Sequence, residues 1–565
     1  MRLVECVPNF SEGRNRAIID SITATIADTD GAHLLDVDPG KDTNRTVVTF
    51  VAEYDSAVEA AFRTIKKASE LIDMRKHTGA HARMGATDVF PFVPVSGVTM
   101  EECVELAKQL GKRVGEELGI PVYLYENAAT SKDRRNLASV RSGEYEALPD
   151  KLEDSRWKPD YGPVEFNARS GATVIGARKF LIAYNVNLNT RSSKIANDIA
   201  LTIREAGRNK RDERGKFVRD ENGVPMKQPG TLKDCKAVGW YIDEYDRAQI
   251  SINLTDFNVT PPHVAFDECV REAEARGVRV TGSELVGLIP LGAILQAGRH
   301  YMNRAGVSTG VPESEIIETA IQSLGLRDVS SFDPQQKIIE YRVAREMPLA
   351  GLTVKSFVDL TSTDAPAPGG GSVAALMASM SGALTSMVAN LTVGKKGYKK
   401  VWEEMKEVAP QAQELKAAFL TAVDEDTFAF DAVMDAMKLP RTTEEENKRR
   451  DAAIESATRE AIEVPFGVLR RCRDALPLVE AVAERGNVNS LSDVGVAALA
   501  LRAAAGGALL NVLINLPGIS DAAYVDRTSG EGVKILEEVK ERCHSVVMSV
   551  IGKLQESLNR TQQSG

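Results

Sequence analysis

The stretch TVVTFVAEYDSAVEAAFRTIKKASELI, residues 46–72, combines the two patterns that decide the fold of the first part of the chain. Residues 46–52 are rich in β-branched side chains, which is typical of a β-strand. From Ser56 to Ile72 the apolar residues recur with a helical period. Strand-like and helix-like segments alternate in the same way on both sides of this stretch. The alternation predicts an α/β region, built as an α+β sandwich with helices packed on a sheet.

The alternation of strands and helices occurs twice and then stops. It predicts two similar subdomains at residues 1–178 and 179–328, followed by a linker at 329–352. The charged stretch Arg208–Lys236 contains an Asn-Gly turn signal, and we interpret it as an exposed, hairpin-like excursion. From residue 353 to 565 β-branched runs nearly vanish, which predicts an all-α helical-bundle domain. Its helices are predicted at 372–391, 398–438, 442–484 and 491–515, with a last helix to about 563.

The composition limits the classes of function. The chain has 565 residues, a formal net charge of -10 and a sequence pI of about 5.5, whereas a general nucleic-acid binder would carry a basic excess. Six scattered cysteines without a CxxC pair argue against a zinc site or a disulfide framework and fit a reducing cytosol. The N-terminal residues lack a signal-peptide pattern. The apolar run Val496–Leu516 contains Arg502, which is costly in a bilayer, so we interpret it as a buried helix rather than a membrane span.

Two of the six histidines lie in RKHTGAHARMG, residues 75–85, in a loop between a predicted helix and a predicted strand. Histidine exchanges protons near neutral pH, and loops on an α/β scaffold often carry catalytic groups. On the residues alone, a pair of ordinary surface histidines is an equal alternative. Asp36 and Asp38 flank the end of the second predicted strand, and Asp38 precedes Pro39-Gly40, so turn formation is its first expected role.

A second candidate site lies at the start of the helical domain. Gly369, Gly370 and Gly371 in APAPGGGS allow the backbone to approach a ligand closely, and Ser372 opens a helix whose free N–H groups suit an anion. The lysine of a Walker motif does not follow. A flexible linker that ends in a serine N-cap is the alternative interpretation.

One carboxylate interrupts an apolar stripe on a predicted helix. At 3.6 residues per turn the stripe consists of Leu415, Phe419, Ala422, Asp426, Ala429, Val433 and Met437. A buried Asp426 must find a partner or hold a proton with a raised pKa, and either state suits an acid or base. An internal ion pair is the alternative. Asp424 falls on another face, which is expected to be solvated.

Other polar groups in the helical part have less specific patterns. Asn511 and Asn515 lie one turn apart in ALLNVLINL. Buried amides need partners, so we expect first that they form hydrogen bonds between helices. The more specific alternative is that they recognise a polar ring of a substrate. Lys395 and Lys396, with two further lysines in GKKGYKK, form either a solvated face or a surface that attracts a polyanionic substrate tail.

These segments resemble the formiminotransferase-cyclodeaminase family over nearly the whole chain and in the same order. The transferase part of the resemblance rests on LVECVPNFSEG, LLDVDPG, TNRTVVTFV, HARMGATDVFPFVPV, GIPVYLY, GATVIGARKFLIAYNVNL and GSELVGLIPL. The cyclodeaminase part rests on APAPGGGSVAA, LTVGKKGYKK, VDEDTFAFDAVMDAMKLP, GNVNSLSDVGVAALAL and NVLINL. The charged stretch Arg208–Lys236 looks longer than the family usually has at that place.

The resemblance implies a bifunctional folate enzyme of histidine degradation. Its first reaction moves the formimino group of N-formimino-L-glutamate to tetrahydrofolate and releases L-glutamate. Its second reaction cyclises 5-formiminotetrahydrofolate to 5,10-methenyltetrahydrofolate and releases ammonia. The implied co-substrate is tetrahydrofolate in polyglutamylated form, which passes between the two sites, and neither a metal nor a nucleotide is expected. The resemblance also implies a homo-oligomer, a ring of dimers. From the composition we expect a cytoplasmic protein without a nucleic-acid partner or a membrane span.

The resemblance also assigns roles to residues. The transferase histidine of the family falls on His81, and Asp38 is expected to orient it. The deaminase aspartate falls within Val423–Asp426, so Asp424 and Asp426 both remain candidates, and the apolar stripe favours Asp426. The folate-binding stretch falls on Gly162, Pro163, Val164, Glu165, Phe166, Asn167, Ala168, Arg169, Ser170 and Gly171. Substrate binding is also expected of Gly369, Gly370, Gly371, Ser372, Lys395 and Lys396.

Two other functions remain open at this point. In the first, only one of the two sites works and the other part of the chain serves binding or assembly. In the second, the protein is a scaffold that binds folate without turnover. A working acid–base histidine and aspartate would separate the enzyme from the scaffold.

Overall fold

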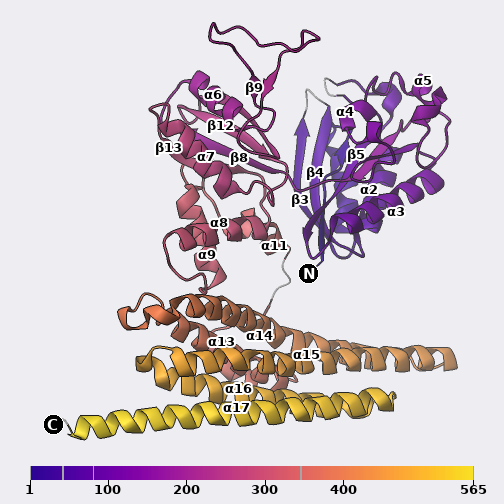
Figure 1. Ribbon diagram of the computed structural model, residues 1–565. Helices are drawn as coiled ribbons and strands as arrows, with labels where there is room; N and C mark the ends of the chain where they lie inside the picture. The colour runs from indigo at the N-terminus through magenta and orange to yellow at the C-terminus, as the bar shows by residue number, and fades with distance from the viewer. Residues whose placement is uncertain (1, 41–43, 80–81, 344–346, 564–565) are drawn as a thin grey trace. The chain divides into compact units, whose positions relative to one another are not determined.

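The computed structural model describes residues 2–40, 44–79, 82–343 and 347–563, with the side chains of 560–563 left aside. The chain divides into two compact units (Figure 1). The first unit comprises Met1–Ala297 and Ile321–Ala344, and the second comprises Gly298–Ala320 and Arg345–Gly565. The first unit contains sheets and helices and the second is helical, which confirms the predicted fold class.

The first unit begins with a mixed sheet in the strand order β1-β4-β2-β5-β7-β6, and β3 pairs with the free side of β4. Pairing around β4 is antiparallel, whereas β7 is parallel to both β5 and β6. The strands are β1 (Leu3–Cys6), β2 (Asn9–Phe10), β3 (Ala32–Gly40), β4 (Arg45–Glu53), β5 (Thr87–Ser96), β6 (Val122–Glu126) and β7 (Thr173–Ala177).

One face of this sheet is packed by helices and the other is partly open. Val48, Phe50 and Ala52 of β4 point into the core with apolar residues of three helices, because alternate side chains of a strand face opposite sides. The helices are α1 (Arg16–Ala27), α2 (Ala57–Leu71) and α3 (Met100–Leu118). On the other face, the short helices α4 (Leu137–Val140) and α5 (Leu148–Glu153) cover β5, β6 and β7. The part of that face formed by β1, β3 and β4 remains available for a site.

The predicted turn at Asp38-Pro39-Gly40 is wrong, because β3 continues through these residues. Asp38 pairs with Val47, and Gly40 pairs with Arg45. Proline lacks a backbone donor, and an edge strand such as β3 tolerates this because one side of the strand needs no partner. Asp38 is therefore a strand residue with its side chain on the same side of β3 as Asp36.

The second sheet of the first unit is antiparallel throughout, in the order β11-β12-β8-β13. Two helices accompany it, as the alternating sequence pattern predicts. The elements are β8 (Ile182–Leu188), α6 (Ser193–Ile203), β11 (Cys235–Ile242), β12 (Arg247–Leu254), α7 (Pro262–Glu274) and β13 (Val280–Val286). Two further helices, α8 (Leu291–Arg304) and α9 (Glu313–Leu324), follow β13.

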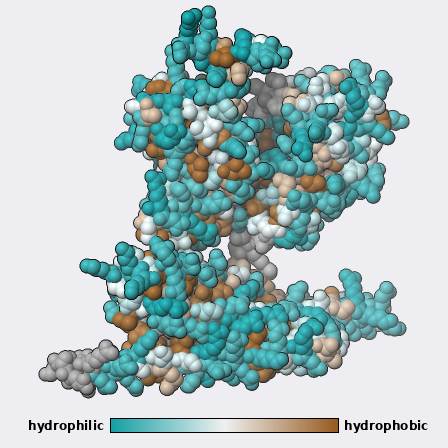
Figure 2. Space-filling model, viewed as in Figure 1, coloured by the Kyte–Doolittle hydropathy of each residue, from teal (hydrophilic) through white to brown (hydrophobic). Residues whose placement is uncertain are grey.

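The charged excursion between α6 and β11 is a hairpin, in which β9 (Arg208–Asn209) pairs with β10 (Lys227–Gln228). Its tip contains two equivalent turns. The carboxylate of Asp212 accepts hydrogen bonds from the backbone N–H groups of residues 214 and 216, and that of Asp220 accepts from residues 222 and 224. Figure 2 shows this hairpin as a mostly hydrophilic surface with a small hydrophobic spot.

The first half of the predicted linker is folded. It contains α10 (Pro334–Lys337) and α11 (Ile339–Arg342), and Ile339 is fully buried. The guanidinium of Arg342 donates to the backbone carbonyl of Leu35 at 3.0 Å, which ties this segment to β3. The segment up to residue 343 therefore belongs to the first unit rather than to a free connection.

The helical unit has the long helices that the sequence predicts. They are α13 (Gly370–Asn390), α14 (Trp402–Met437), α15 (Glu444–Arg485), α16 (Leu491–Asn515) and α17 (Ala522–Gln563), preceded by α12 (Val354–Thr361). Small residues such as Ala375 and Ala378 of α13 and Ala505 of α16 fill the core, which lets these helices approach closely.

Two helices of this unit are long and apolar enough to cross a membrane by length and composition alone. In the most apolar stretch of Gly370–Asn390, 61% is buried inside the structure, and in that of Val488–Gly518, 44% is buried. The core helices of a soluble bundle can be equally long and apolar. The outer side of α16 nevertheless exposes Val496, Leu510 and Ile514, with exposed fractions of 54%, 69% and 75%.

Candidate functional site

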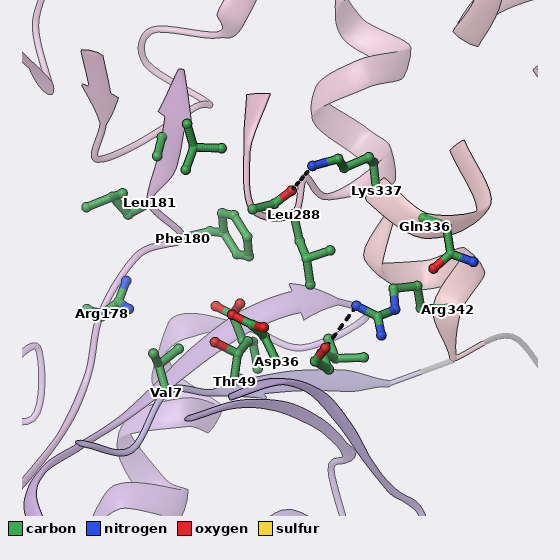
Figure 3. Close-up of a pocket in the computed structure, with 15 residues that line it drawn as sticks. Val7, Asp36, Thr49, Arg178, Phe180, Leu181, Leu288, Gln336, Lys337 and Arg342 are labelled. Atoms are coloured by element: carbon green, nitrogen blue, oxygen red, sulfur yellow. Dashed lines mark hydrogen bonds between the residues drawn. The ribbon is translucent and has the colours of Figure 1, made fainter. Parts of the chain in front are cut away.

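The open face of the first sheet forms the floor of a pocket of about 480 Å³. Glu5, Asp36 and Thr49 contribute from β1, β3 and β4, which places carboxyl and hydroxyl groups side by side. Figure 3 shows Phe180 and Leu288 pointing toward Asp36 and Thr49 from the opposite wall. A concave site with an apolar wall and a few polar groups is typical of small-molecule binding.

The ionisable groups of this pocket carry both signs of charge. Burial raises the pKa of Glu5 to about 7, while the positive charge of Arg178 acts in the opposite direction. Lys337 and Arg342 line the same pocket, and both donate to backbone carbonyls. A carboxyl group with a pKa near 7 can give or take a proton at neutral pH. The sequence analysis missed Glu5, although a glutamate inside the short apolar strand LVECV is a usable signal.

A second polar region surrounds the loop of residues 75–85. His81 lies outside the described residues, but both flanks of the loop are described. The backbone N–H of Met74 donates to the carbonyl of Arg169 at 2.9 Å, and Gly85 forms a β-bridge with Gly171. The loop that carries His81 is therefore bound at both ends to the predicted folate-binding stretch.

The stretch from Gly162 to Gly171 is held in an open turn. The side chain of Asn167 accepts from the N–H of Ser170 at 3.0 Å and donates to the carbonyl of Gly119. Gly171 has a φ of +67°, and a Cβ at this position would lie 2.1 Å from the carbonyl oxygen of Met84. Only glycine allows this close approach. Val164 and Phe166 are exposed, so the turn offers apolar surface to a ligand.

Asp38, the predicted partner of His81, is exposed on β3. It lies two residues from Asp36, which lines the pocket, and on the same side of the strand. Its contact with His81 stays a prediction.

In the helical unit the glycine-rich start of α13 contacts the middle of α14. The hydroxyl of Ser372 donates to the carboxylate of Asp426 at 3.0 Å, and Ser372 is fully buried. A Cβ on Gly371 would lie 2.0 Å from Oδ1 of Asp426, so the absence of a side chain at residue 371 makes room for the carboxylate. Asn511 of α16 approaches Gly370 from another side. The geometry makes Gly370–Ser372, Asp426 and Asn511 neighbours.

The environment of Asp426 suits proton transfer. Burial raises the pKa of this carboxyl, and hydrogen bonds from the side chain and backbone of Ser372 partly oppose the rise. A carboxyl group poised in this way can be protonated or ionised according to what binds beside it.

Asp424 has a different role. It is fully buried, and its two oxygens accept the backbone N–H groups of Leu349 at 2.8 Å and Ala350 at 2.9 Å. The prediction that this face of the helix is solvated is wrong for Asp424. Because both of its oxygens accept hydrogen bonds from the backbone, Asp424 anchors the segment at Leu349 and Ala350. The geometry therefore favours Asp426 over Asp424 as the carboxyl that could react.

Lys395 and Lys396 are exposed at the C-terminal end of α13, whereas Gly369–Ser372 lie at its N-terminal end. A helix of this length separates the two ends by about 30 Å. The unit therefore does not bring the lysines to the Asp426 cluster. Among the described residues no group of histidine, cysteine and carboxylate side chains has the arrangement of a metal site.

The fold and the two separate polar clusters define an enzyme with two sites, one in an α/β unit and one in a helical unit. Family models for the N-terminal subdomain of the formiminotransferase domain, for the formiminotransferase domain and for formiminotransferase-cyclodeaminase match residues 3–178, 183–344 and 353–533. The chain belongs to the formiminotransferase-cyclodeaminase family.

Relatives cover the whole chain or parts of it. The chain is 43% identical to the mouse formimidoyltransferase-cyclodeaminase, over 97% of this chain and 99% of that protein. A glutamate formimidoyltransferase of Streptococcus pyogenes serotype M1 is 43% identical over 53% of this chain and 93% of its own length. A methenyltetrahydrofolate cyclohydrolase of Methylorubrum extorquens is 40% identical over 35% of this chain and 97% of its own length.

The different roles of the two aspartates predict different costs of substitution. Asp424→Ala removes the acceptor of two buried backbone N–H groups, which should destabilise the helical unit by about 3 kcal/mol and lower its unfolding midpoint by about 6 °C or more. Asp426→Ala should change the midpoint less, because the carboxyl it removes is itself disfavoured by burial, which raises its pKa. Thermal unfolding followed by circular dichroism at 222 nm measures both. Equal midpoints for the two variants would contradict the anchoring role of Asp424.

Proposed function

We propose that this chain is a bifunctional folate enzyme that transfers the formimino group of N-formimino-L-glutamate to tetrahydrofolate and then cyclises the product to 5,10-methenyltetrahydrofolate. The observation that carries the proposal is that each of the two units holds a polar cluster with a buried carboxyl whose pKa is raised, Glu5 in the first and Asp426 in the second. Similarity to a relative of the same length, and to shorter relatives named for a transferase and for a cyclohydrolase, supports both activities. Tetrahydrofolate is then the co-substrate that the two sites share.

We assign the transfer step to His81. N5 of tetrahydrofolate attacks the amidine carbon of N-formimino-L-glutamate and loses a proton, and the departing glutamate nitrogen gains one. One histidine can carry out both proton transfers in turn, first as base and then as acid. The turn Gly162–Gly171 lies against the flanks of the His81 loop, which supports it as the surface that holds folate. Asp38 is proposed to orient the histidine.

We assign the cyclisation step to Asp426. N10 attacks the same carbon, and its proton passes to the imino nitrogen, which becomes an amino group. The bond from carbon to that nitrogen then breaks, and with one further proton the nitrogen leaves as ammonia. Asp426 donates a proton to the leaving nitrogen, and the raised pKa of the buried carboxyl favours the protonated form that this step needs. Ser372 fixes the direction of the carboxyl.

We further propose a cytoplasmic homo-oligomer. Val496, Leu510 and Ile514 lie together on the exposed side of α16, whereas apolar residues on a monomer surface are usually scattered singly. This apolar surface supports contact with another copy of the chain. The ring of dimers that the family resemblance implies is one such assembly. All six cysteines are free and buried, which is compatible with a reducing compartment.

The two-site assignment predicts separable activities. With N-formimino-L-glutamate and tetrahydrofolate supplied, His81→Ala should abolish transfer, by at least 1000-fold, because the proton carrier is lost, yet it should still cyclise added 5-formiminotetrahydrofolate. Asp426→Ala should transfer normally and accumulate 5-formiminotetrahydrofolate. Release of L-glutamate, methenyl absorbance and ammonia, followed together, separates the steps. If the wild-type protein binds folate but makes neither product, the scaffold function is favoured over the enzyme. If either variant loses both activities, the two activities do not belong to separate sites.

The close approach of α13 to Asp426 predicts the effect of a single methyl group. Gly371→Ala places a Cβ where the carboxylate now lies, so cyclisation should fall by at least 100-fold while transfer stays unchanged. Gly506→Ala on α16 is the matched control, because a Cβ there meets open space. The rate of methenyl formation from 5-formiminotetrahydrofolate measures the difference. Equal cyclisation rates in the two variants would exclude Asp426 from the site.

We also propose that Lys395 and Lys396 attract the glutamate tail of polyglutamylated folate. The double variant Lys395→Glu, Lys396→Glu should lose most of the preference for pentaglutamate over monoglutamate substrate, because it replaces attraction by repulsion. Lys534→Glu, Lys540→Glu on the exposed side of α17 is the control with the same change of charge. The ratio of kcat/KM values for the two substrates measures the preference. If the double variant keeps the wild-type ratio, Lys395 and Lys396 do not bind the glutamate tail.

A further inference from the structure

Asn511 and Asn515 lie one turn apart on α16, and their side-chain amides bind different partners. Nδ2 of Asn515 donates to the carbonyl of Ala461 on α15 at 3.3 Å, which confirms the expected hydrogen bond between helices. It also donates to the backbone carbonyl of Asn511 at 3.0 Å. Nδ2 of Asn511 donates to the carbonyl of Gly507 in its own helix at 2.8 Å. Asn515 therefore joins two helices, whereas the bond of Asn511 stays within one.

The bond to Gly507 fixes the direction of the Asn511 amide. A carbonyl oxygen can only accept, so the amide nitrogen faces Gly507 and the amide oxygen faces away from it. Within the described part of the chain no group donates to Oδ1 of Asn511, and the side chain is partly exposed. This oxygen can therefore accept a hydrogen bond from a ligand.

Close packing of α16 on α13 brings this acceptor to the start of α13. A Cβ on Gly507 would lie 3.0 Å from the Cβ of Ala374, so the two helices touch there. One turn away along each helix, a Cβ on Gly370 would lie 3.2 Å from Nδ2 and 3.6 Å from Oδ1 of Asn511. Gly370 is exposed, so a ligand can reach the backbone beside the amide.

Asp426 meets the same short stretch of backbone from α14. Its Oδ1 lies 2.0 Å from the position of a Cβ on Gly371, the residue that follows Gly370. Because consecutive Cα atoms are only about 3.8 Å apart, the carboxyl and the amide lie against neighbouring residues. Asp426 is partly exposed, as Asn511 is. Two helices thus place a carboxyl group and an amide oxygen at the first turn of α13.

We propose that Asn511 accepts a hydrogen bond from the nitrogen that leaves as ammonia, and that it makes the site specific for a formimino group. The inference rests on the proposed cyclisation at Asp426. In the intermediate this nitrogen is an amino group with two N–H donors and one lone pair. The lone pair takes the proton of Asp426, which becomes a carboxylate, and the bond to carbon breaks with its electron pair on nitrogen. Oδ1 of Asn511 accepts one N–H and stabilises the positive charge that develops on the nitrogen.

The same geometry disfavours a formyl group. 5-Formyltetrahydrofolate has a carbonyl oxygen where 5-formiminotetrahydrofolate has its N–H, and a carbonyl oxygen cannot donate. This oxygen would face Oδ1 of Asn511, which leaves two acceptors without a proton between them. A site that binds an N–H of its substrate strongly rejects an analogue without that group. Asn511 therefore separates two ligands of nearly equal size.

Two variants at residue 511 and one control at residue 515 test the proposal. Alanine removes both the bond to Gly507 and the acceptor, whereas serine can keep the backbone bond through its hydroxyl but is too short to reach the substrate. We expect Asn511→Ala and Asn511→Ser each to lower kcat for cyclisation by about 10- to 100-fold, because a hydrogen bond to a developing charge is lost. Asn515→Ala loses the same kind of bond to a backbone carbonyl, and it should keep at least half of the wild-type kcat.

Inhibition separates recognition of the leaving nitrogen from a general structural role. 5-Formyltetrahydrofolate competes with 5-formiminotetrahydrofolate in the cyclisation assay, and its Ki is divided by the KM of the formimino compound. Both Asn511 variants should lower this ratio by at least about tenfold, whereas Asn515→Ala should keep the wild-type ratio. A structural defect would weaken both ligands alike and leave the ratio unchanged. Circular dichroism at 222 nm checks that the helical unit of each variant is folded.

The possible failures are distinguishable. A wild-type ratio in both Asn511 variants overturns the inference, and so does an equal fall of the ratio in Asn515→Ala. Both results require a wild type that cyclises its substrate. A wild type that releases no ammonia from added 5-formiminotetrahydrofolate would instead overturn the proposed function, and this inference with it.

Discussion

The alternation of side chains along β4 governs the first unit. One set of residues, with Val48 and Phe50, enters the core under three helices, and the alternate set, with Thr49, faces the opposite side. Because α4 and α5 cover only part of that side, Glu5, Asp36 and Thr49 form the floor of a pocket rather than a second core. A shift of register by one residue would exchange the two sets, so the core and the pocket depend on the same pairing.

Carboxylates in buried surroundings have different roles here because they meet different partners. Each oxygen of Asp424 accepts one backbone N–H group, and the side chain is fully buried. Among the described residues Ser372 is the hydrogen-bond donor to Asp426, and burial raises the pKa of this carboxyl. Burial also raises the pKa of Glu5, in a pocket with room for a ligand. The number of fixed donors, rather than burial itself, separates an anchor from a group that can exchange a proton.

The sequence predicts the parts of the structure that depend on local pattern. The long helices of the second unit end near the predicted residues, and the apolar stripe favours Asp426, which the contact with Ser372 supports. The turn at Asp38 is wrong because pairing with β4 overrides a local turn signal. The hydrogen bond from Arg83 to His77 could not be predicted, since its two partners are held by Asn44 and Glu146 from distant parts of the chain. Local patterns specify elements, and long-range contacts specify sites.

The two sites use glycine for opposite geometric reasons. Gly171 has a positive φ and lies against the carbonyl of Met84, so it closes a turn beside the His81 loop. Gly371 lies in the first turn of α13, where a side chain would occupy the place of the Asp426 carboxylate. A glycine run before a helix is therefore no sufficient sign of a flexible linker. Here the run is ordered, and its missing side chains create the space in which a carboxyl group can lie against the start of α13.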